Sequence, residues 1–147
     1  MKEALLSIIK DENRIITGPI DPQYLSDNLG RKKGTAEAVV FPVSTEEVSG
    51  IMRYAWENNL PVTPRGAGTN LVGSTVPSGH GIVLDVSLMN HVLELDEETF
   101  TATVEPGVVL EDFQAYVESK GLFYPPDPGE KKATIGGNIS TNAGGMR

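Results

Sequence analysis

The pattern of apolar and polar positions predicts short helices alternating with short strands. Residues 2–10 place apolar side chains at helical spacing, which predicts an amphipathic helix. Residues 11–36 are polar and are broken by several glycines and prolines, so we expect an irregular segment with one helical turn over 22–29. Residues 38–41 form an apolar run that stops at Pro42, which predicts a short buried strand.

A second helix is predicted to begin at a capping box. Ser44 is followed three residues later by Glu47, and the apolar side chains after it fall on one helix face. We expect this helix to end near Asn58, with a strand over 60–63 and another over 82–86. A strand, a helix and a strand in this order predict a βαβ unit.

The second part of the chain follows a different pattern. Segments 91–96 and 99–105 predict a β-hairpin with an acidic, solvated turn. Residues 110–120 predict a helix that ends at Gly121, and residues 122–147 are expected to lack regular structure. The predicted fold class is therefore α+β, with a small βαβ subdomain followed by the start of a second α+β subdomain.

Composition narrows the classes of function. The chain has 147 residues, a net charge of −8 and no cysteine. The acidic balance argues against a nucleic-acid partner, because phosphate backbones need a basic face. The lack of cysteine excludes disulfides and thiol chemistry within these residues. No apolar run reaches membrane-spanning length and the N-terminus does not read as a signal peptide, so we expect a cytoplasmic protein or, for a longer parent, one peripheral to the membrane.

The first candidate site is a glycine-rich segment over 64–75, between two predicted strands. It is longer than a hairpin turn requires, and its main-chain N–H groups can form a concave anion site. It fits neither the dinucleotide fingerprint, where Leu71 replaces the third glycine, nor the Walker loop, where Ser74 replaces the lysine. Arg65 is its one cationic side chain, so a bound pyrophosphate would rely on main-chain donors and on the hydroxyls of Thr69, Ser74 and Thr75. A surface loop that binds nothing is the alternative.

A second small-residue segment lies over 133–145. Asn138 and Asn142 can donate and accept hydrogen bonds, while Gly136 and Gly137 let a flat ring lie against the backbone. Two such segments in one small domain predict two walls of a single site. Both histidines of the chain lie outside these segments, and no metal site is expected.

Together these motifs resemble the FAD-linked oxidase family of the vanillyl-alcohol oxidase, or PCMH, type. The resemblance rests on residues 64–70, 124–128 and 134–145, and it is strongest for the glycolate oxidase GlcD-like and D-lactate dehydrogenase flavoproteins. It begins at about residue 38, so the helix and irregular segment predicted over 1–37 precede it. It implies an FAD-binding PCMH-type domain over 38–147 that is truncated at its C-terminus.

The resemblance also implies which residues hold FAD. Those that match the pyrophosphate cradle are Pro64, Arg65, Gly66, Ala67, Gly68, Thr69, Asn70, Gly73 and Ser74. Those that match the rest of the cofactor site are Pro125, Asp127, Ala133, Thr134, Gly136, Gly137, Asn138, Thr141, Asn142 and Gly144. Thr69 stands where some relatives carry the histidine that attaches the flavin covalently, so we expect non-covalent FAD.

The implied activity is that of a flavin-dependent 2-hydroxy-acid dehydrogenase or oxidase, in which FAD supplies the redox chemistry. The parent would act on a small 2-hydroxy acid such as glycolate or D-lactate and pass electrons to a quinone or a partner flavoprotein. No residue of this chain is expected to be catalytic, because the substrate domain has no counterpart, so the chain alone should be inactive. The alternatives are the FAD domain of a UDP-N-acetylenolpyruvoylglucosamine reductase-like enzyme and a non-catalytic module that binds a nucleotide or a protein.

Overall fold

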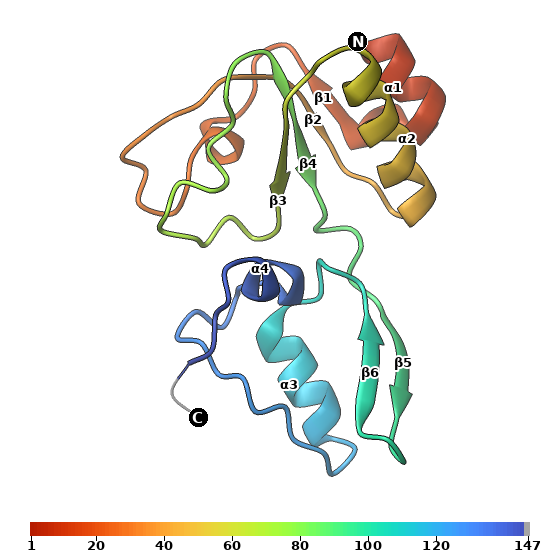
Figure 1. The fold of residues 1–147 in the computed structure, drawn as a ribbon, viewed down its shortest axis with the longest axis vertical. Coiled ribbons are helices and arrows are strands. Elements are labelled where there is room, and N and C mark those ends of the chain that lie inside the picture. The colour runs from red at the N-terminus through yellow and green to blue at the C-terminus, as the bar shows by residue number, and fades with distance from the viewer. Residues whose placement is uncertain (146–147) are drawn as a thin grey trace.

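The computed structural model describes residues 1–145 and shows two halves stacked end to end (Figure 1). The first half contains a four-stranded sheet and the second a two-stranded sheet, each packed with helices. This arrangement confirms the predicted α+β class. Met146 and Arg147, the last residues of the predicted tail and domain, lie outside the described residues.

The first half is built around a mixed sheet. Its elements are α1 (Lys2–Ile9), β1 (Ile15–Thr17), β2 (Ala36–Val40), α2 (Thr45–Glu57), β3 (Val62–Arg65) and β4 (Gly81–Asp85), with the 3₁₀ turns η1 (Glu12–Arg14) and η2 (Pro22–Leu25). The strand order is β1-β2-β4-β3, in which β2 and β3 run parallel to β4 and β1 runs antiparallel to β2. The predicted βαβ unit is present, with β4 inserted between its two strands.

The sequence pattern does not predict β1, which lies in the segment expected to be irregular. Ile15 is buried, and the strand pairs with the end of β2, where Ile15 faces Val40. So short a strand shows no alternation, and its pairing with β2 specifies it. Through α1 and β1 the N-terminal segment shares one hydrophobic core with β2.

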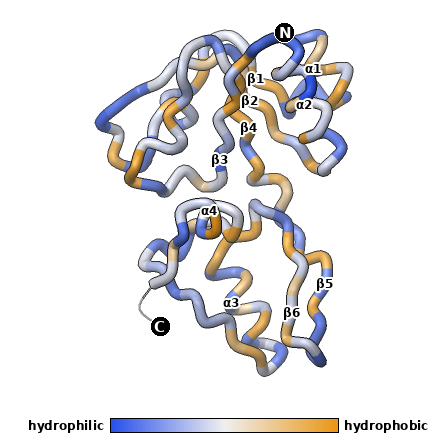
Figure 2. Tube along the Cα trace, in the orientation of Figure 1, coloured by the Kyte–Doolittle hydropathy of each residue, from blue (hydrophilic) through white to orange (hydrophobic). Residues whose placement is uncertain are grey.

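That core lies between the sheet and the two helices α1 and α2, which cover one of its faces (Figure 1). Its buried members are Leu5, Ile9, Ile15, Ala38, Val40, Ile51, Ala55, Ile82 and Leu84. Because side chains alternate along a strand, Val39 and Val83 point to the opposite face, and they are fully buried as well. Figure 2 shows hydrophobic residues gathered along β2 and β4, and Figure 1 shows the segments 18–35 and 66–80 on the side away from the helices.

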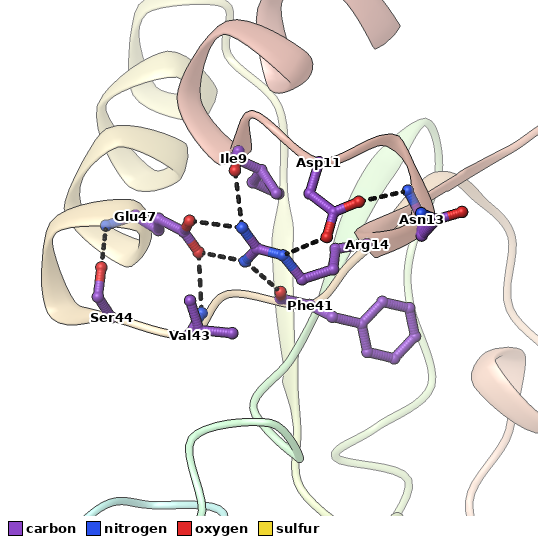
Figure 3. A network of polar contacts seen from close by, with 8 residues as sticks. All are labelled: Ile9, Asp11, Asn13, Arg14, Phe41, Val43, Ser44 and Glu47. Carbon is purple, nitrogen blue, oxygen red and sulfur yellow. Dashed lines mark hydrogen bonds and ion pairs between the residues drawn. The ribbon is translucent and has the colours of Figure 1, made fainter.

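An ion pair ties the N-terminal segment to α2 (Figure 3). Arg14 Nη1 lies 2.6 Å from Glu47 Oε2, and Arg14 Nη2 lies 2.8 Å from Glu47 Oε1. The same guanidinium donates to the carbonyls of Ile9 and Phe41. Hydrogen bonding from Arg14 lowers the pKa of Glu47, and the carboxylate in turn raises the pKa of Arg14.

The predicted capping box at the start of α2 is present with one change. The Ser44 hydroxyl accepts the Glu47 amide at 3.2 Å, as expected. The Glu47 carboxylate, however, accepts the Val43 amide, one residue before the cap (Figure 3). The pairing with Arg14 accompanies this position of the carboxylate, so the Glu47 side chain holds both the residue that precedes the cap of α2 and Arg14 of η1.

The second half places a hairpin beside two helices. Its elements are β5 (Val92–Asp96), β6 (Thr101–Val104), α3 (Leu110–Glu118) and α4 (Ile135–Ser140). β5 and β6 pair antiparallel, which confirms the hairpin. The buried residues of its separate core are Val108, Leu110, Phe113, Val117 and Ile135. No helix in residues 1–145 is long and apolar enough to cross a membrane.

α4 contradicts the expectation that the tail lacks regular structure. The Thr134 hydroxyl caps it by accepting the Gly137 amide at 3.2 Å. The helix is too short to show a repeat, and it contains two adjacent glycines, which are poor helix formers. Its formation therefore depends on the cap and on the burial of Ile135.

Candidate functional site

The first glycine-rich segment lies at the carboxyl edge of the sheet. It leaves Arg65 at the end of β3 and returns to Gly81 at the start of β4. Because these strands are parallel, the chain must travel back the length of a strand, which accounts for the length of the segment without any ligand. Ligands of open α/β sheets bind beyond this edge. Figure 1 shows that the edge faces the second half of the molecule.

A cleft of about 360 Å³ separates this segment from the second half. One wall consists of Pro64, Arg65, Gly66, Ala67, Gly68, Thr69, Asn70, Ser74 and Thr75. The other consists of Pro128, Glu130, Ala133, Thr134, Gly136, Gly137, Asn138, Ser140, Thr141 and Ala143, and Val86 and Pro106 complete the lining. The two small-residue segments thus meet as walls of one cleft, as the sequence predicts.

The two walls lie close together at Gly66 and Thr134. A β-carbon built on Gly66 would overlap the Thr134 hydroxyl. Gly66 is not among the glycines with positive φ, so its backbone conformation does not demand glycine. Thr134 is buried and cannot easily turn away. Glycine is therefore required at position 66 by the closeness of the second wall.

Replacing Thr134 with valine is expected to lower the free energy of unfolding by about 1 kcal/mol. Valine keeps the shape of the side chain but removes the oxygen that accepts the Gly137 amide. Thr134→Ser keeps that oxygen and serves as the control. Urea denaturation followed by circular dichroism measures both variants, and equal losses in the two would contradict a capping role.

The main-chain amides of residues 66–70 are available to a ligand. Within residues 1–145 none of these N–H groups donates to a protein acceptor. The amides that follow are occupied, because Val72 and Ser74 donate to the Asn70 side chain and Gly73 donates to Asp27. A row of free N–H groups is the donor set that binds phosphate. The loop thus has a free part, 66–70, and an anchored part that follows it.

The Arg65 guanidinium is held by the protein itself. Its Nη1 donates to the Ser26 carbonyl at 3.0 Å, and its Nε lies 4.0 Å from Asp85 Oδ2. The central carbon of the guanidinium, Cζ, lies 5.8 Å from the centre of the Tyr24 ring. Burial lowers the pKa of Arg65, and Asp85 opposes that effect. A β-carbon on Gly68, where φ is +71°, would overlap the guanidinium. Arg65 therefore supports the loop, a role that the sequence pattern does not reveal.

The second wall offers a side-chain amide. The first amides of α4 already donate to the Val108 and Pro106 carbonyls and to Thr134. Asn138 lines the cleft and is only 9% exposed, and in the described part of the chain its side-chain amide has no hydrogen-bond partner. A carboxamide can both donate and accept, so Asn138 suits a polar group of a ligand.

Several residues predicted for the site do not line this cleft. They are Gly73, Pro125, Asp127, Asn142 and Gly144. The Asp127 carboxylate accepts from Gln114 at 3.2 Å and pairs with Lys131, and its amide donates to the Gly144 carbonyl. These contacts hold the C-terminal segment to itself and to α3. The assignment of these residues to a cofactor stays a prediction from the resemblance.

Other residues line the cleft without having been predicted. They are Val86, Pro106, Pro128, Glu130, Ser140 and Ala143. Val86 and Pro106 carry no chemical signal in a sequence, because only the meeting of the two halves brings them to the cleft. Glu130 and Ser140 lie close to predicted residues in the chain, and this closeness is the signal in the sequence that points to them.

Comparison with known proteins agrees with the geometry. A family model described as FAD binding domain matches residues 36–147. The chain is 45% identical over 148 residues to the glycolate oxidase subunit GlcD of Bacillus subtilis (strain 168), which covers 100% of the chain and 32% of that protein. It is 49% identical over 136 residues to a D-lactate dehydrogenase of Anaerostipes hadrus, which covers 91% of the chain and 29% of that protein. The chain therefore spans about a third of the length of these relatives.

Solved structures show the same fold. A 4-ethylphenol oxidase from Gulosibacter chungangensis superposes with a TM-score of 0.77 at 26% identity, covering 93% of the chain and 27% of that protein. A p-cresol methylhydroxylase superposes with a TM-score of 0.74 at 20% identity, covering 94% of the chain and 28% of that protein. The fold, the cleft and the family match agree, and the chain belongs to the FAD-binding domain family of FAD-linked oxidoreductases.

Proposed function

We propose that the chain is the FAD-binding portion of a flavin-dependent dehydrogenase or oxidase of small 2-hydroxy acids. Two relatives at 45% and 49% identity are named for glycolate and D-lactate, which are both 2-hydroxy acids. A D-2-hydroxyglutarate dehydrogenase of Bos taurus, 39% identical over 137 residues, is named for a third. In the parent enzyme a quinone or a partner flavoprotein would accept the electrons.

One observation carries the role in cofactor binding: residues 66–70, whose amides have no acceptor in the described part of the chain, line a cleft that also contains the unpartnered side chain of Asn138. These groups fit FAD, because its pyrophosphate needs several N–H donors and its polar rings need groups that donate and accept. The cleft of 360 Å³ is at the lower end of the range of about 300–1,000 Å³ that is usual for ligand pockets. Part of the cofactor would therefore extend beyond it.

The chain itself would bind and orient the cofactor. When bound, FAD supplies the redox chemistry. Residues 66–70 would hold the pyrophosphate by their amides, and Asn138 would contact a polar group across the cleft. Because Arg65 is already engaged with Ser26 and Asp85, the main-chain donors would provide most of the attraction for the anion.

We propose that the FAD is bound non-covalently. Thr69, which lines the cleft, occupies the place where some members of the family carry the attaching histidine. A threonine hydroxyl is a weak nucleophile without an adjacent base. The cytoplasmic location, with the parent peripheral to the membrane, stays a prediction.

Titration of the purified chain with FAD is expected to quench flavin fluorescence, and denaturation should release all of the flavin. ADP, which shares the pyrophosphate, should compete, whereas riboflavin, which has no phosphate, should compete weakly. The titration is run at protein concentrations high enough to detect a weak site. Absence of FAD binding, with ADP still bound, would favour the nucleotide-binding module instead.

Turnover separates the enzyme classes. The chain alone is expected to show no reduction of an artificial acceptor by glycolate or D-lactate. The longer parent protein should reduce it with one of these or with a related 2-hydroxy acid. A parent that ignores 2-hydroxy acids but reduces UDP-N-acetylenolpyruvoylglucosamine would support the alternative reductase.

A further inference from the structure

Residues 21–30, here called the strap, contact the glycine-rich loop although they lie far from it in the sequence. The Ser26 carbonyl accepts from Arg65 Nη1 at 3.0 Å. The Asn28 amide donates to the Asn70 carbonyl at 3.0 Å. The family match begins at residue 36, so the strap lies outside it. The strap is nevertheless joined to the loop at several points.

Asp27 makes the strap contact that bears most directly on the shape of the loop. Its Oδ2 accepts the Gly73 amide at 3.0 Å, and its Oδ1 accepts the Gly30 amide at 3.0 Å. Hydrogen bonds to an ionised acceptor are stronger than those between neutral groups. Gly73 has a φ of +76°, and the hydrogen bond from its amide to Asp27 holds it in this conformation. The Asp27 carboxylate thus holds both the turn that ends at Gly30 and the part of the loop around Gly73.

The contact at Gly73 completes the anchored part of the loop. Asn70 Oδ1 accepts the amides of Val72 at 3.3 Å and Ser74 at 3.1 Å, which leaves the amide between them to Asp27. All three amides are therefore satisfied within the protein, while those of residues 66–70 stay free. A loop that is ordered before binding loses less conformational entropy when the ligand arrives.

We propose that Asp27 is a positioning residue of the cofactor site. It holds the anchored part of the loop, so that residues 66–70 and their free amides keep their place in the wall of the cleft. Asp27 does not itself line the cleft, and its negative charge would repel a phosphate, so it acts through Gly73. The link to FAD rests on the proposed function, whereas the ordering of the loop does not.

Hydrogen exchange in the free protein tests the ordering. In Asp27→Ala, the Gly73 amide is expected to exchange about tenfold faster or more, as the loss of a charged hydrogen bond implies. The Val83 amide in β4 is the internal reference, because global unfolding exposes both amides and local release exposes only Gly73. Asp21→Ala is the matched control, since that carboxylate accepts from Gln23 within its own turn. Equal acceleration at Gly73 and Val83, or none at Gly73, would overturn the proposal.

Titration with FAD tests the consequence for the cofactor. Asp27→Ala should bind FAD about tenfold more weakly than the wild type, while Asp21→Ala should bind it equally well. Unchanged affinity in Asp27→Ala, together with a faster Gly73 amide, would show that the strap orders the loop without serving the cofactor and would overturn the positioning role. If the wild type itself binds no FAD, the proposed function fails, and the exchange rates still decide whether Asp27 orders the loop.

Discussion

Gly66→Ala is expected to weaken FAD binding at least about tenfold and to lower the free energy of unfolding by about 1–3 kcal/mol. The added methyl group would overlap the Thr134 hydroxyl, so the two walls of the cleft must move apart. The donors on residues 66–70 would then no longer converge with Asn138 on one ligand. Flavin fluorescence titration measures the affinity, and urea denaturation measures the stability.

Two further variants show whether the overlap is the cause. Gly129→Ala is the control, because a β-carbon there meets nothing within 4 Å and its φ is not positive. In the double variant Gly66→Ala, Thr134→Ala the overlapping hydroxyl is removed, so the combined loss should be smaller than the sum of the single losses. Strict additivity in both stability and affinity would show that Gly66 matters for another reason.

Arg14→Met is expected to lower the free energy of unfolding by about 3 kcal/mol, the lower end of the range for breaking one side of a buried ion pair. The side chains of Arg14 and Glu47 are 16% and 15% exposed, so Glu47 would be left largely buried without its partner. The carbonyls of Ile9 and Phe41 would lose a donor at the same time (Figure 3). Urea denaturation followed by circular dichroism is the measurement, and a loss below that of an ordinary surface substitution would contradict it.

The same ion pair predicts a dependence on pH. Because Arg14 lowers the pKa of folded Glu47, the carboxylate contributes its full stability above the ordinary value of about 4.3. This contribution is lost as the pH falls through the lower pKa of the folded state. Glu47→Gln should therefore be less stable than the wild type near neutral pH, and the difference should shrink in acid. Glu46→Gln, at an exposed position of the same turn, is the control. A gap between Glu47→Gln and the wild type that is unchanged in acid would rule out this linkage.

The sequence pattern predicts the parts of the fold whose signals are local. α2 follows from its capping box, and the hairpin of β5 and β6 follows from alternation around an acidic turn. β1 and α4 are not predicted, because their signals are not local. Pairing with β2 specifies β1, and the Thr134 cap together with the burial of Ile135 specifies α4. Elements this short are set by partners that are remote in the chain.

In the candidate site, too, some features have a local signal in the sequence and others do not. Small residues predict both walls of the cleft, and the structure brings them together. The length of the first segment does not by itself indicate a ligand site, because the parallel pairing of β3 and β4 already requires a long connection. The roles of Arg65 and Asp27 could not be predicted, because both depend on contacts between the strap and the loop.

The two hydrophobic cores have no residue in common. Because the cores are separate, we expect each half to open locally while the other stays folded. A ligand in the cleft touches both halves, and the opening of either would release it, so its binding free energy protects both. With flavin bound in the cleft, the two halves would unfold together in a single cooperative transition.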